Sequence, residues 1–74
     1  LKPVESQEFL DTLATYFSCS GNLDQAAELL HAHKNTVKYR LGRIQTLTGL
    51  DLKKPEDNFM LYMAVLAWKL GAGV

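Results

Sequence analysis

The spacing of the apolar residues constrains the fold of this 74-residue chain more than any other feature. Apolar residues recur at steps of three and four, and no alternation typical of a strand lasts more than a few residues. Glycines 21 and 49 and the stretch 32–34 interrupt this pattern, and Pro55 restarts it. The pattern therefore predicts an all-α fold, a small domain of four helices at about 6–18, 23–31, 35–48 and 55–70.

Residues at the segment ends support these boundaries. Ser6, Asn22 and Asn35 are the predicted N-caps, because their side chains can accept a hydrogen bond from the first backbone N–H groups of a helix. Gly49 follows the third helix, at a position where a left-handed backbone is common. Pro55 suits the first position of the last helix, since its missing N–H has no partner there anyway.

The chain has no net charge, yet its middle segment gathers basic residues on one helix. At 100° per residue, one stripe of segment 35–48 carries Val37, Leu41, Ile44 and Thr48. The opposite side carries Thr36, Lys38, Tyr39, Gly42 and Arg43. Both acids of residues 22–49, Asp24 and Glu28, precede residue 31. The sequence therefore predicts a basic face without acids on the third helix.

The two middle helices have the outline of a helix-turn-helix, a short helix and a longer one joined by a tight connection. Ala27 lets the helices approach closely, and Leu30 and Val37 can fill the angle between them. His31 occupies the turn position that glycine often holds, and we expect it to pack in the turn at some cost in backbone strain. The N-terminus of the longer helix is then exposed and can bind an anion such as phosphate.

Several blocks of the sequence also resemble a known family. "TL…YF" (12–17), "AAELLHAHKNTVKYRL" (26–41) and "LTGLDL" (47–52), followed by "PEDN" and an apolar helix, are similar to the C-terminal helix-turn-helix domain of PucR/CdaR-type transcriptional regulators. The block 26–41 is also similar to the DNA-binding end of the Fis nucleoid protein. Ala32 departs from the pattern, because such motifs prefer a larger aliphatic residue, and this indicates a looser turn.

The resemblance implies a bacterial transcription regulator that dimerises and carries sensory domains ahead of this one. The chain also lacks an initiator methionine. We therefore expect residues 1–74 to be a single helix-turn-helix DNA-binding domain, a C-terminal fragment of a longer regulator.

We predict sequence-specific binding of double-stranded DNA, with the helix at 35–48 in the major groove. The candidate DNA-binding residues are Asn22, His33, Lys34, Asn35, Thr36, Lys38, Tyr39, Arg40 and Arg43. Lysine and arginine suit phosphates, whereas Thr36 and Tyr39 can bind phosphate or base edges. Three assignments have alternatives. For Asn22 the alternative is a capping role alone, and for His33 it is the absence of a DNA contact. Arg40 either binds a phosphate or forms an ion pair with Glu28 or an acid of the last helix.

The last helix predicts a second interaction surface, because apolar residues cover almost its full circumference. Such a helix in a small domain indicates a partner, and we expect a homodimer through helix 55–70 or through the missing domains. The rival function is a protein-interaction module that uses this helix to dock a partner.

Other functions find little support in the sequence. The single cysteine, Cys19, excludes an internal disulfide and favours a cytoplasmic location. The longest apolar run, residues 59–68, is too short to cross a membrane. His31 and His33 have no further ligands nearby for a metal. Neither an enzyme with catalytic residues nor a cofactor is expected.

Overall fold

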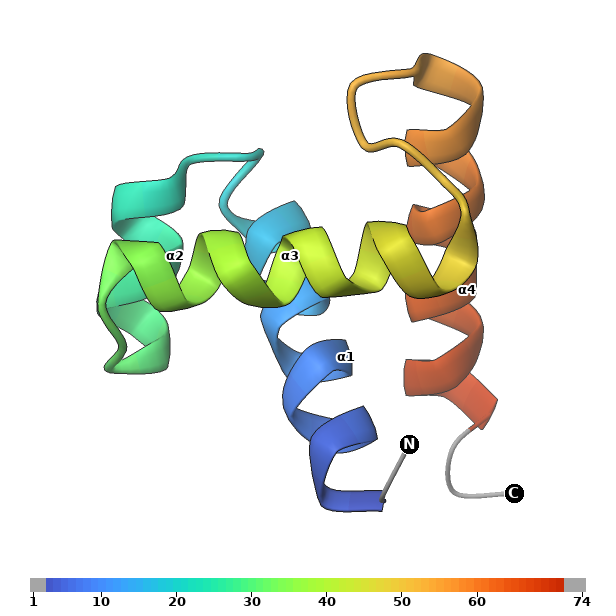
Figure 1. Cartoon of the computed structure of the whole chain (residues 1–74). Helices are drawn as coiled ribbons and strands as arrows, with labels where there is room; N and C mark the ends of the chain where they lie inside the picture. Colours follow the sequence, from blue (N-terminus) through green and yellow to red (C-terminus); the bar gives the residue numbers. More distant parts are fainter. Residues whose placement is uncertain (1–2, 72–74) are drawn as a thin grey trace.

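The computed structural model describes residues 3–71, with side chains from Gln7 onward. Over that range the chain forms four α-helices: α1 (Pro3–Ser18), α2 (Leu23–Leu30), α3 (Lys34–Thr48) and α4 (Pro55–Gly71). The predicted all-α fold of four helices is confirmed. α1 packs against each of the other three helices, and α3 crosses in front of α1 with α2 behind its first half (Figure 1).

Two of the predicted helix starts are wrong. α1 begins at Pro3, so Ser6 lies within the helix and does not cap it. Proline suits the first helical position, and the sequence analysis did not consider it there. α3 begins at Lys34 with His33 as its N-cap, so Asn35 is the second helical residue. The Gly49 cap is confirmed, with φ at 74° in the left-handed region.

The core takes residues from all four helices. Its buried apolar members are Leu13, Ala14, Cys19, Ala26, Ala27, Val37, Leu41, Ile44, Leu61 and Val65. Val37 has no exposed surface, so it marks the centre of this core. The predicted inward stripe of α3 is confirmed for its first three residues, whereas Thr48 is exposed. The Thr48 hydroxyl donates to the Ile44 carbonyl at 2.8 Å instead of packing inward.

The segment 49–54 turns the chain from α3 into α4 and is held by side chains at both ends. The Leu52 N–H donates to Gln45 Oε1 on α3 at 2.7 Å. The Asp51 N–H donates to Asp57 Oδ2 on α4 at 2.9 Å. Tyr62 of α4 packs edge-on against Phe17 of α1, with ring centroids 5.3 Å apart. The loop thus leads from α3 into α4, which packs against α1.

Candidate nucleic-acid interface

α2 and α3 form a helix-turn-helix in which the chain turns at His31, and the two helices run in clearly different directions (Figure 1). The backbone of His31 has φ 54° and ψ 41°, in the left-handed region. The His31 N–H donates to the Glu28 carbonyl at 3.2 Å, and the Ala32 N–H donates to the Ala27 carbonyl at 3.0 Å. These bonds close the end of α2 as they do where glycine is present, so the turn forms without one. The His31 side chain is exposed, so the expectation that it packs in the turn is wrong.

Small buried residues bring the two helices together as predicted. Ala26 has no exposed surface and Ala27 is also buried, so the backbone of α2 lies close to its neighbours. Val37 of α3 fills the space between them, and Leu30 packs against the edge of the same core. This packing fixes the direction in which α3 leaves the turn and therefore which of its sides faces solvent.

His33 rather than Asn35 caps the start of α3. The Asn35 N–H donates to the His33 Nδ1 at 3.0 Å, and the Thr36 N–H donates to the His33 carbonyl at 2.9 Å. An imidazole can accept this bond only through an unprotonated Nδ1, so the proton of the neutral ring lies on Nε2. One N–H donor thus remains on the exposed His33 side chain. The cap also occupies the Asn35 N–H, so this donor at the exposed N-terminus of α3 already has a partner within the chain.

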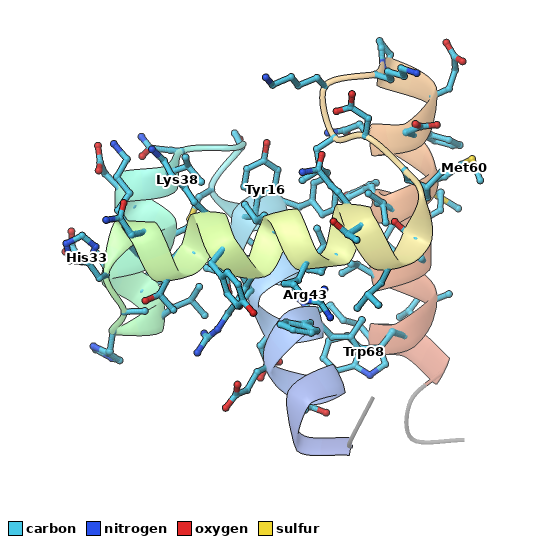
Figure 2. All side chains as sticks on the ribbon, in the orientation of Figure 1. Tyr16, His33, Lys38, Arg43, Met60 and Trp68 are labelled. Carbon is cyan, nitrogen blue, oxygen red and sulfur yellow. The ribbon has the colours of Figure 1, made fainter. Side chains whose placement is uncertain are left out.

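The solvent face of α3 has a central line of residues at steps of four, three and four: Asn35, Tyr39, Gly42 and Thr46. Tyr39 is 65% exposed, which confirms that it points away from the core. Lys38 and Arg43 project from opposite edges of the helix (Figure 2). Lys38 is exposed, whereas Arg43 and Thr36 are half-buried. One cation therefore lies on each side of the central line.

Two of the predicted phosphate-binding cations are paired with acids. Lys34 Nζ lies 3.3 Å from Asp24 Oδ1, and Arg40 Nη2 lies 3.8 Å from Glu8 Oε2. Arg40 thus forms an ion pair, which was one of the two roles predicted for it. Its partner, however, belongs to α1 rather than to α2 or α4. α3 itself contains no acid. The packing of α1 and α2 brings acids beside it, so this face is less basic in space than in sequence.

Two further residues border the face. Asn22 caps α2, because its Oδ1 accepts a hydrogen bond from the Gln25 N–H at 3.0 Å. The capping role is confirmed, and a phosphate contact of Asn22 stays a prediction. Lys53 was not among the predicted DNA-binding residues, yet it lines a groove of about 380 Å³ together with Lys38 and Tyr16. Lys53 lies in the loop after α3, and no sequence pattern indicates that this loop folds back toward Lys38.

The comparison with known families decides what this helix-turn-helix is. Residues 9–67 match the PucR C-terminal helix-turn-helix domain. The chain belongs to this family. The matched residues include all of α2, the turn and α3, with most of α1 and α4. The resemblance seen in the blocks at 26–41 and 47–52 is therefore confirmed. No solved structure matches the chain significantly.

Curated relatives of this PucR-type domain include three regulators. The chain is 43% identical to the carbohydrate diacid regulator of Escherichia coli (strain K12) over 73% of its length. It is 36% identical to the purine catabolism regulatory protein of Bacillus subtilis (strain 168) over 93% of its length. It is 34% identical to the DNA-binding transcriptional activator AdeR of the same organism over 76%. The chain spans only 13–14% of the length of these relatives.

The part of this PucR-type domain that the structure describes contains neither a metal-binding cluster nor a membrane-spanning helix. Among the residues searched, no group of three His, Cys, Asp or Glu side chains is placed to hold a metal ion. No helix between residues 3 and 71 has the length and hydropathy needed to cross a membrane.

Replacing His31 with glycine is expected to stabilise this PucR-type domain by about 1 kcal/mol, because a side chain in the left-handed region costs about 1–2 kcal/mol. In a domain of this size the thermal midpoint should rise by about 4–8 °C. Thermal denaturation followed by circular dichroism measures this. His31→Ala is the control, since it removes the imidazole but keeps the strained Cβ and should gain little. Equal gains from both variants would mean that the imidazole, not the backbone, is the source of strain.

Proposed function

We propose that this chain binds double-stranded DNA sequence-specifically through the solvent face of α3, as the cytoplasmic output domain of a longer bacterial transcription regulator. The observation that carries the proposal is the exposed polar face of α3 with Lys38 and Arg43 at its two edges. Membership of the PucR-type family supports it, as does the similarity to AdeR, a DNA-binding transcriptional activator. No residue has a catalytic role in this proposal.

In the proposed complex α3 lies in the major groove, whose width of about 12 Å admits a helix of about 10–12 Å diameter. The central line then faces the base pairs, so the side chains of Asn35 and Tyr39 extend to base edges. Lys38 on one edge and Arg43 on the other reach the phosphates of the two strands. Thr36 is half-buried at the start of α3, and its hydroxyl donates a hydrogen bond to a phosphate or a base edge.

The start of the helix-turn-helix supplies further phosphate contacts. Lys34 Nζ lies 3.3 Å from Asp24 Oδ1 at the surface of the free domain. In the proposed complex, Lys34 leaves Asp24 and binds a phosphate. His33 donates its Nε2–H, and Asn22 presents the N-terminus of α2 to the same strand. Arg40 has five N–H donors, so it can bind a phosphate beside Arg43 while it remains near Glu8.

Selection of bound duplexes from a random pool tests the proposal. Sequence-specific binding predicts that repeated rounds enrich a common motif and that the enriched duplex binds more weakly as salt rises. Retention on heparin at low salt is the faster companion measurement. A chain that flows through heparin and enriches no motif does not bind DNA, and the proposal then fails.

Replacing Asp24 with asparagine is expected to strengthen DNA binding about two- to fivefold. The change removes an acid from the face and frees Lys34, whose exposed ion pair contributes at most about 1 kcal/mol to stability. Fluorescence anisotropy with the enriched duplex measures the effect at constant salt. Asp11→Asn is the matched control, because Asp11 is an exposed acid on α1 outside the helix-turn-helix. An equal gain in both variants would show a net-charge effect only.

A homodimer through α4 is the second part of the proposal. Large apolar side chains remain exposed on α4, from Phe59 at 63% and Met60 at 55% to Leu70 at 83%. Two half-sites read by a dimer lie about 34 Å apart, and the domain is 31 Å along its longest axis, so two copies can bind neighbouring turns. Enriched duplexes should then carry paired motifs. Single motifs together with a monomeric chain in sedimentation favour the alternatives, a dimer formed by the missing domains or a docking surface for another protein.

A further inference from the structure

Gly42 has no explanation within the protein. It lies near the middle of α3, where glycine is the poorest helix former apart from proline. A Cβ built on Gly42 meets no atom within 4 Å outside its own helix backbone. Its φ is not in the left-handed region, in contrast to Gly21 and Gly49. Neither a turn nor a close contact within the described residues requires a glycine there.

The position of Gly42 on the helix gives a reason outside the chain. It belongs to the central line of the solvent face, between Tyr39 and Thr46, which both have exposed side chains. A 15-residue helix is straight and about 22 Å long, whereas the major groove curves away from it. Such a helix approaches the floor of the groove most closely at one point along its length. At that point a side chain decides how deeply the helix can sit.

We propose that Gly42 is the point of closest approach between α3 and the DNA, where the missing side chain lets the helix backbone lie against the base pairs. The inference rests on the proposed function and adds a positioning residue to it. A groove about 12 Å wide leaves little clearance for a helix of nearly the same diameter. A side chain at residue 42 therefore lifts α3 outward, so that Asn35 and Tyr39 lose their reach to base edges.

The test is a size series at Gly42, with alanine and leucine. Both residues are better helix formers than glycine and meet open space, so the thermal midpoint should rise by about 4–8 °C. Affinity for the duplex enriched by the wild-type chain should fall about tenfold for Gly42→Ala and about 100-fold for Gly42→Leu, as expected when one hydrogen bond to a base edge, and then two or more, are lost. Stability and binding thus change in opposite directions.

Two comparisons make the result specific. Ser18→Leu adds the same side chain at an exposed position of α1, outside both α3 and the proposed dimer helix α4, and its DNA affinity should equal that of the wild type. Random-sequence duplex is bound mainly through its phosphates. The Gly42 variants should therefore bind it with an affinity within about twofold of the wild type and with the same salt dependence.

Three outcomes overturn the inference: wild-type affinity of Gly42→Leu for the enriched duplex, a lower thermal midpoint for both Gly42 variants, or an effect on self-association alone. Failure of the proposed function is recognised separately, because the wild-type chain itself then enriches no duplex and Lys38→Gln changes nothing. If the wild type binds and Lys38→Gln weakens binding, a null result at Gly42 counts against Gly42 only.

Discussion

The double variant Lys38→Glu, Arg43→Glu is expected to bind the enriched duplex at least about 100-fold more weakly than the wild-type chain. Each substitution removes one charge-assisted bond to phosphate, which contributes about 1.5–3 kcal/mol, and adds repulsion from the new carboxylate. The two residues project from opposite edges of α3, so the variant loses contacts to both strands. Fluorescence anisotropy at low salt measures the loss.

The salt dependence of binding tests the same contacts independently. Each lost contact between a cation and a phosphate reduces the steepness of log affinity against log salt by about 0.9 for duplex DNA. Lys38→Gln and Arg43→Gln should therefore each reduce the slope by about this amount, and their effects should add because the residues do not share a contact. A slope that stays unchanged in either variant means that its cation lies away from the phosphates.

A matched charge reversal separates a local contact from a change in net charge. Lys69→Glu makes the same change on the exposed last turn of α4, where the effect on stability is a few tenths of a kcal/mol to about 1 kcal/mol. This variant should keep most of the DNA affinity. The thermal midpoint of the Lys38 and Arg43 variants is measured in parallel. Loss of binding together with early melting would show instead that half-buried Arg43 supports the fold.

The helices could be predicted from sequence because their periodicity and caps are local properties. The apolar stripe at Val37, Leu41 and Ile44 identified the buried side of α3, and the structure confirms it. The error at the start of α3 arose because the chain offers two candidate caps there. His33 and Asn35 can both cap a helix, and the choice depends on which side chain reaches the free N–H once α2 and α3 are packed.

The surroundings of the cations could not be predicted from sequence, because they depend on residues far away in the chain. Arg40 meets Glu8 only because α1 packs against α3, and 31 residues separate the two along the chain. Lys53 reaches the groove beside Lys38 only because Gln45 holds the loop that follows α3. Sequence patterns therefore give the faces of single helices, whereas the net character of a surface follows from packing.

Val37→Asp is expected to unfold the domain. Val37 has no exposed surface, so the new carboxylate would be buried without a partner at the junction of α2 and α3. Burying an unpaired charge costs several kcal/mol, comparable with the total stability of about 5 kcal/mol expected of a domain this small. Far-UV circular dichroism should show the loss of helix at 25 °C. The milder Val37→Ala should cost about 2 kcal/mol and lower the thermal midpoint by about 10 °C.

The same substitution two residues later separates folding from binding. Tyr39 is 65% exposed, so Tyr39→Asp places its carboxylate in water and should leave the thermal midpoint within a few degrees of the wild type. On the central line of α3, however, the carboxylate would face the DNA and should weaken binding about 10- to 100-fold. A folded Val37→Asp variant would contradict the packing of α3 on α2. A Tyr39→Asp variant with wild-type affinity would mean that α3 presents another of its sides to DNA.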